Sequence, residues 1–235
     1  MAGRRSPLEV LPREISAALA GERYWFVIGG QAVRCILPYR PSRDVDFGVL
    51  TAKDSKQLLA QLRRAGEVSL IEQSADTVHL TFQGIDVSVF VLPELGPYTA
   101  DNALTVTGLL ATKLHAILDR GTRRDFFDLY VLLQIEGLGL LECLNALTKV
   151  YATEVNSGLV LRALSYFDDA EAEAELAGEG KGDWRRVRDF FSMAVAALLV
   201  PPTRPLEIQS RLVDVQPLES AASKKKATRK ARKRR

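Results

Sequence analysis

The chain has 235 residues, of which 47% are hydrophobic and 26% charged, so it can build a real core and has the composition of an ordinary soluble protein. No apolar run approaches the roughly 20 residues needed to span a bilayer, and the N-terminus lacks the apolar segment of a secretory signal. We therefore expect a cytoplasmic protein without membrane contact. The two cysteines, Cys35 and Cys143, lack metal-site spacing, and we expect buried thiols rather than a disulfide.

The first part of the chain mixes helical and extended patterns. In chain order we predict a helix over 8–21, a strand over 24–28, a short helix over 31–37, a proline-bounded loop over 38–41, a strand over 44–50, an amphipathic helix over 53–65, strands over 68–72, 78–82 and 85–92, and a candidate edge strand over 105–107. Gln83-Gly84 is a plausible hairpin turn between the last two of the short strands.

After Gly108 the pattern turns helical. Helices are predicted over 109–120, 123–135, 138–151, 159–174 and 184–200, with a glycine-rich linker over 178–182. Strands followed by helices favour an α+β fold, with an N-terminal unit over 1–107, a helical domain over 108–205, and a linker and basic tail over 206–235.

The net charge of +3 conceals an asymmetry between the tail and the body. Residues 224–235 include nine Lys or Arg and no acid, which leaves 23 basic and 29 acidic residues elsewhere, a charge of −6. Such a tail should be disordered when alone and should bind a polyanion such as RNA. The alternative is a solubilising or incidental tail.

Two aspartates, Asp44 and Asp46, lie one residue apart at the start of the second predicted strand. Because side chains alternate along a strand, both carboxylates share one face. Adjacent carboxylates repel one another, and a divalent cation such as Mg²⁺ relieves that repulsion. A glycine pair, Gly29-Gly30, ends the preceding strand and could hold a triphosphate at a helix start. Together these features indicate phosphoryl or nucleotidyl transfer.

A third acid, Asp86, opens an otherwise apolar strand and shares its face with Ser88. A lone acid there is unfavourable without a partner, so Asp86 is a candidate third metal ligand. The alternative places Asp86 exposed at the hairpin end beside Gly84.

Two blocks of this sequence resemble a known family. Gly29-Gly30, thirteen further residues and then Asp44-Val45-Asp46, with Arg40 and Ser42 just before, resemble the DNA polymerase β-like nucleotidyltransferase superfamily. The second block, LLATKLHAILDRGTRRDFFDLYVLL over 109–133, resembles the AbiEii-type nucleotidyltransferase toxins. The resemblance covers about residues 24–133 and implies a small mixed sheet with flanking helices, followed by a helical domain.

The resemblance implies a role for each matching residue. Gly29 and Gly30 would form the triphosphate turn, with Arg40 and Ser42 beside the nucleotide. Metal ligation would fall to Asp44, Asp46 and Asp86, with Asp86 also helping to activate the attacking hydroxyl. Lys113 would reach the phosphates as a point charge, and the last acid of the motif would be either Asp125 or Asp128.

Ordinary structural roles remain open for the second block. Asp125 could only cap its helix together with Thr122, and Asp128 could simply pair with Arg124 four residues earlier. Lys113 could snorkel to solvent from an apolar helix. The basic cluster Arg120, Arg123 and Arg124 could line a nucleotide or RNA path or be a solvated turn, and structural roles are expected for His79 and His115.

The resemblance implies an Mg²⁺-dependent enzyme that transfers a nucleoside monophosphate from an NTP to an acceptor hydroxyl, with tRNA or another RNA as acceptor, and a toxin with a cognate antitoxin protein as partner. The second hypothesis is the same chemistry on a small, antibiotic-like acceptor, which the acidic body would suit. The third is an inactive member of the fold that only binds RNA or protein.

Overall fold

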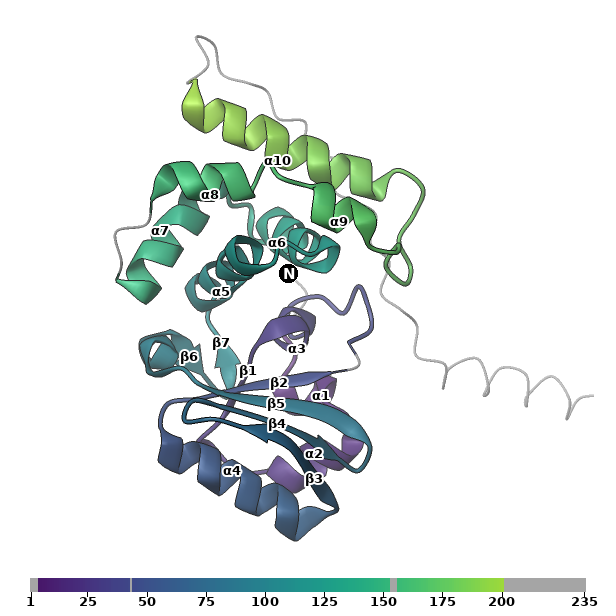
Figure 1. Cartoon of the computed structure of the whole chain (residues 1–235), viewed down its shortest axis with the longest axis vertical. Coiled ribbons are helices and arrows are strands. Elements are labelled where there is room, and N and C mark those ends of the chain that lie inside the picture. The colour runs from purple at the N-terminus through teal and green to yellow at the C-terminus, as the bar shows by residue number, and fades with distance from the viewer. Residues whose placement is uncertain (1–3, 43, 153–155, 201–235) are drawn as a thin grey trace, which may run out of the picture.

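The computed structural model describes residues 4–42, 44–152 and 156–200, and the predicted basic tail lies outside these ranges. Figure 1 shows a sheet-containing unit joined to a layer of helices that follows it in the chain. The five-stranded sheet has the order β1-β2-β5-β4-β3. The α+β fold with a mixed sheet and a helical second part is confirmed.

The chain begins with two short helices rather than the single helix predicted over 8–21. Helix α1 spans Pro7–Val10 and α2 spans Arg13–Leu19. Pro12 separates them, because proline has no N–H to donate and keeps the residue before it out of the helical conformation.

The strands of the sheet lie close to where their patterns predict them. Their bounds are β1 Phe26–Val27, β2 Val45–Val49, β3 Val68–Gln73, β4 Thr77–Phe82 and β5 Ile85–Val91. Strands β2 and β5 are parallel, whereas the other neighbouring pairs are antiparallel. Only two residues of the strand predicted over 24–28 join the ladder. The parallel pair places residues from distant parts of the sequence side by side at the centre of the sheet.

The predicted hairpin turn between β4 and β5 is present. Gln83 and Gly84 both have positive φ, 50° and 78°, as the turn that matches strand twist requires. Helix α4, Ala52–Ala65, packs on β2 and β5 and buries Leu58, Leu59 and Leu62, so its predicted amphipathic face is confirmed. Figure 1 shows α4 on the side of the sheet away from the helical layer.

The predicted edge strand over 105–107 is wrong. After the 3₁₀ segment Pro93–Tyr98, a small hairpin forms from β6, Thr99–Ala100, and β7, Ala103–Leu104. Thr105 then caps the next helix, because its hydroxyl accepts a hydrogen bond from the Gly108 N–H at 3.4 Å.

The helical part contains the rest of the described chain. Its helices are α5 Val106–Asp119, α6 Arg123–Glu136, α7 Leu140–Tyr151, α8 Ser157–Ala163, α9 Asp168–Ala172 and α10 Asp183–Leu199. The single helix predicted over 159–174 is therefore wrong. Asp168, Asp169 and Glu171 fall in the first turn of α9, where acidic side chains favour a new helix start.

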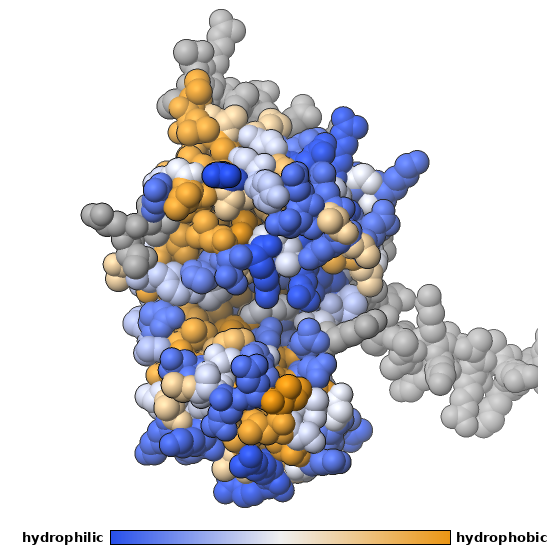
Figure 2. Space-filling model, in the orientation of Figure 1, coloured by the Kyte–Doolittle hydropathy of each residue, from blue (hydrophilic) through white to orange (hydrophobic). Residues whose placement is uncertain are grey.

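An aromatic cluster holds the helical layer together. Phe126 of α6 is fully buried and contacts the rings of Phe167, Trp184 and Phe191 at centroid distances of 5.2–6.0 Å. Figure 2 shows hydrophobic surface at the C-terminal end of α10, where Leu199 is exposed. None of the helices that the structure describes is long and apolar enough to cross a membrane.

The sheet and the helical layer meet through a short helix. Helix α3, Gly29–Arg34, packs on β2 and also contacts α5 and α6. The loop that follows α3 leads into β2. The glycine pair, the loop and the start of α6 therefore converge where the two parts of the molecule join (Figure 1).

Candidate functional site

The glycine pair is in direct contact with the end of the loop and with β2. Gly29 has a φ of 61°, and a Cβ atom placed on it would lie 2.5 Å from Asp46 Oδ2. A Cβ atom on Gly30 would lie 2.7 Å from Ser42 Oγ and 3.1 Å from Arg40 Nη2. No side chain larger than hydrogen fits at either position without a shift. The structure thus brings together five of the residues singled out in the sequence.

Two of the three candidate metal ligands lie in neighbouring strands, and the third lies just before one of them. Asp46 lies in β2 opposite Ser88 of the parallel strand β5, while Asp44 is exposed in the bend just before β2. Asp86 lies two residues before Ser88 and therefore on the same face of the sheet as Asp46. It is exposed near the hairpin end, as the alternative interpretation expects. Within residues 4–42, 44–152 and 156–200, no three His, Cys, Asp or Glu side chains form a group that could hold a metal.

The surroundings of Asp46 disfavour the ionised form of its carboxyl group. Burial raises the pKa of its carboxyl group, Lys113 opposes that effect, and Asp44 adds to it. Arg120 and Arg124 also act to lower the pKa, although more weakly. Two carboxylates, one of them half-buried, beside a glycine turn suit a hard cation such as Mg²⁺. Asp44 and Asp46 are therefore the residues that fit a metal ion best.

Asp128 is the centre of a buried ion cluster. Its side chain has no exposed area, and it receives hydrogen bonds from Arg40 Nε at 2.8 Å and Nη2 at 2.6 Å. Lys113 Nζ donates at 2.6 Å, and the Tyr39 hydroxyl completes the set. Burial acts to raise the pKa of Asp128, but Lys113 and Arg40 outweigh it and lower that pKa. Asp128 therefore pairs with Arg40 and Lys113, and the interpretation of a local pair with Arg124 is wrong.

Asp125 forms a second centre on the other side of Lys113. It is fully buried and accepts hydrogen bonds from Arg120 Nε at 2.8 Å and Nη2 at 3.1 Å. The Thr122 hydroxyl also donates to it, and Lys113 Nζ lies 3.6 Å away. The helix has no side-chain cap of the predicted kind, since Thr122 donates to the carboxylate instead of capping a backbone N–H. Lys113 is buried between two acids rather than snorkelling to solvent.

Low pH should lower the free energy of unfolding, because it protonates Asp125. Burial alone would raise its pKa, but Arg120, Lys113 and Thr122 lower it from 3.8 to about 2. A depressed carboxyl pKa contributes stability above its ordinary value, and that stability is lost as the pH falls towards 2. We expect Asp125→Asn to lower the free energy of unfolding at pH 7 by about 2 kcal/mol and to flatten its decline below pH 5. Urea unfolding at several pH values measures this, and parallel curves for the two proteins would contradict it.

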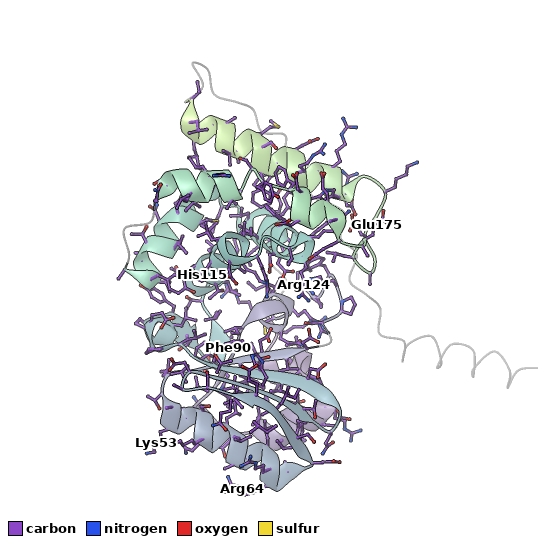
Figure 3. All side chains as sticks on the ribbon, viewed as in Figure 1. Lys53, Arg64, Phe90, His115, Arg124 and Glu175 are labelled. Carbon is purple, nitrogen blue, oxygen red and sulfur yellow. The ribbon has the colours of Figure 1, made fainter. Side chains whose placement is uncertain are left out.

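Three arginines that are close in sequence have different environments. Arg120 pairs with Asp125, whereas Arg123 is buried and pairs with Glu179 at 2.6 Å. Arg124 is exposed, and no ion pair among the described residues includes it. Figure 3 shows Arg124 where the helical layer meets the loop before β2. Arg124 is thus the member of the predicted basic cluster best placed to meet a ligand.

Both histidines make local contacts. His79 Nδ1 lies 3.0 Å from Ser88 Oγ, and the His115 ring packs on Tyr151 at 4.9 Å.

Tyr39 is a residue of the site that the sequence does not single out. Its place beside Arg40 in a proline-bounded loop was the available signal, but its partner, Asp128, lies 89 residues away.

Comparison with known proteins shows similarity to one family, to a bacterial relative and to a solved structure. The family model described as "Nucleotidyl transferase AbiEii toxin, Type IV TA system" matches residues 70–205, a range that includes Asp86, Lys113, Asp125 and Asp128. An uncharacterized protein of Aquifex aeolicus (strain VF5) is 28% identical over 205 residues, covering 83% of this chain and 97% of that protein. A crystal structure of a "putative nucleotidyltransferase from H. pylori" superposes with a TM-score of 0.51 at 16% identity, covering 81% of this chain and 92% of that chain, and shows a shared fold.

Proposed function

Because the chain belongs to the AbiEii nucleotidyltransferase toxin family, we propose that it transfers a nucleoside monophosphate from an NTP to an acceptor hydroxyl and releases pyrophosphate. One observation carries the proposal. Asp46 lies against the Gly29-Gly30 turn, and the cations that act on it come from α5 and the start of α6, inside the segment that the family model matches. Acid, glycine turn and cations are the three parts that such a transfer needs.

Asp44 and Asp46 would hold Mg²⁺, with Asp86 as a third acid on the neighbouring strand. When bound, the ion would neutralise phosphate charge and help to align the acceptor with the α-phosphate. The burial of Asp46 and its proximity to Asp44 support this assignment, because an ionised carboxylate in such a place is stabilised by a cation.

The protein's own groups would position and stabilise the substrates. The backbone N–H groups at Gly29 and Gly30, with Arg40 and Ser42 beside them, would hold the triphosphate. Lys113 and Arg124 would stabilise the negative charge that develops on the phosphates. Asp86, which is exposed, would be free to accept the proton of the acceptor hydroxyl.

RNA, with tRNA foremost, is the proposed acceptor, and a cognate antitoxin is the proposed partner. The family is described as the toxin of a type IV toxin–antitoxin system, which supports the toxin role and the existence of an antitoxin. The nine basic residues of the tail over 224–235 favour a polyanionic acceptor. In this arrangement residues 1–107 supply the transfer core and residues 108–205 the helical domain.

A labelling experiment tests the proposal. The purified chain is incubated with Mg²⁺, total tRNA and each α-labelled NTP in turn, beside Asp44→Ala/Asp46→Ala. We expect label to move onto RNA with the wild type alone, which would identify the nucleotide and the acceptor class together. Failure of every NTP in the presence of measurable RNA binding would contradict the proposal and favour an inactive binding protein.

Removing the tail separates the two acceptor classes. A chain ending at residue 223 should lose transfer to RNA, because the basic residues that bind the polyanion are gone. The same truncation should leave transfer to a small cationic acceptor nearly unchanged. Retained transfer to RNA at physiological salt would show that the tail is incidental.

A further inference from the structure

Asp128 accepts as many hydrogen bonds as a carboxylate can. An ionised carboxylate offers about four acceptor positions, two on each oxygen. Oδ1 receives the Tyr39 hydroxyl and Arg40 Nε, and Oδ2 receives Arg40 Nη2 and Lys113 Nζ. The side chain has no exposed area. No lone pair is left to bind a metal ion or to take a proton from an acceptor hydroxyl.

The partners of Asp128 come from both parts of the molecule. Tyr39 and Arg40 belong to the loop between α3 and β2, whereas Lys113 belongs to α5 and Asp128 itself to α6. Arg40 Nη2 lies beside the Gly30 backbone, at 3.1 Å from the place of a Cβ atom there. One buried carboxylate thus links the loop at the glycine turn to Lys113, whose charge acts on Asp46.

We propose that Asp128 is a positioning residue, which fastens the loop of residues 38–42 to Lys113 and takes no part in metal binding or proton transfer. The proposal rests on the proposed nucleotidyl transfer at this site and separates the roles of the acids, leaving chemistry to Asp44, Asp46 and Asp86. Asp128 acts through Arg40 and Lys113, whose places at the triphosphate site it determines.

The contrast with Asp46 supports this division of roles. Asp46 is partly exposed, lies in a strand and makes no ion pair among the residues the structure describes. Asp128 is closed off on every side by donors. A group that must exchange partners during a reaction needs an open coordination position, and a group that holds others in place does not.

Kinetics of Asp128→Asn test the proposal, with the exposed Asp169→Asn as a matched control. We expect kcat/KM to fall about a hundredfold, which is the loss that a small misplacement of reacting groups causes. The Mg²⁺ concentration for half-maximal activity and the acidic midpoint of the pH–rate profile should both stay at their wild-type values. A tenfold rise in the half-activating Mg²⁺ concentration, or loss of the acidic limb, would overturn the proposal and make Asp128 a ligand or base.

Two further variants test the contacts of Asp128 with Tyr39 and Arg40. Tyr39→Phe removes one hydroxyl and should lower kcat/KM only a few-fold, without unfolding the protein. Arg40→Met combined with Asp128→Asn should be no more than about threefold worse than Asp128→Asn alone, because Asp128 acts through Arg40. Fully multiplicative losses would overturn the proposal.

Urea unfolding distinguishes a failure of this proposal from a failure of the proposed function. The shifts in unfolding midpoint of Arg40→Met and Asp128→Asn should be strongly non-additive whether or not the wild type transfers nucleotides. Additive shifts in an active protein would overturn the positioning role alone. If the shifts are non-additive but the wild type is inactive with every NTP and acceptor, Asp128 does hold the loop to Lys113. In that case the proposed nucleotidyl transfer is rejected.

Discussion

Replacing Asp46 with asparagine should lower the rate of nucleotide transfer by at least about a thousandfold and yet raise the temperature of unfolding. The loss follows from removing a charge that holds the cation at the phosphates. The gain follows from the burial of Asp46, which raises the pKa of its carboxyl group and makes the ionised form unfavourable in the folded protein. Labelled transfer and calorimetry on the same preparations measure the two effects.

The size of the stability effect depends on pH. Because the folded-state pKa of Asp46 is raised, the wild type loses stability as the pH rises from the ordinary carboxyl pKa to the folded-state pKa, and this loss disappears in acid. The unfolding temperatures of Asp46→Asn and the wild type should therefore converge as the pH falls. Mg²⁺ should stabilise the wild type more than the variant. The exposed Asp76→Asn serves as control, and a variant that loses stability together with activity would contradict the prediction.

Replacing Arg123 by alanine should lower the stability of the protein and leave transfer nearly unchanged. Replacing Arg124 by alanine should lower transfer and leave the stability nearly unchanged. Arg123 pairs with Glu179 through two hydrogen bonds of 2.6 and 3.0 Å, and its guanidinium lies 4.6 Å from the Trp184 ring. Removing it leaves Glu179 buried without its partner, which costs about 3 kcal/mol and lowers the unfolding temperature by roughly 6–12 °C. Transfer by the remaining folded protein should be nearly unchanged, because these contacts lie between α6 and the segment before α10.

Arg124→Ala should instead leave the unfolding temperature within about 1 °C and lower kcat/KM for transfer about tenfold. The side chain is exposed and pairs with no described acid, so little stability depends on it. The exposed Arg185→Ala in α10 is the matched control. Equal loss of stability in the Arg123 and Arg124 variants would mean that both arginines are structural.

The sequence predicts elements well where local patterns determine them. The alternation in 85–91 and the leucine stripe of α4 give the observed strand and helix, since each buries a face set by its own period. Predictions fail where one residue interrupts a favourable pattern, as Pro12 does between α1 and α2. They also fail where two helical periods follow one another, as in α8 and α9, because hydrophobic periodicity does not show the change of direction between them.

The site is only partly readable from the sequence. The motif residues Gly29, Gly30 and Asp46 do come together, because the glycine turn lies directly against β2, the strand that carries Asp46. The pairing of Asp128 with Arg40 spans 88 residues, and the sequence suggested the nearer Arg124 instead. Local spacing cannot reveal a partner that a separate structural unit supplies, so the sequence alone leaves Asp125 and Asp128 as alternatives.

The long separation between Arg40 and Asp128 has a consequence for a growing chain. During synthesis the N-terminal part emerges first and can begin to fold on its own. Until α5 and α6 have also left the ribosome, Tyr39 and Arg40 have no carboxylate to bind, and the charge of Lys113 does not yet act on Asp46. A nascent fragment would therefore carry the acids and the glycine turn in an inactive form. On the proposed function, nucleotide transfer would begin only after most of the chain had been made.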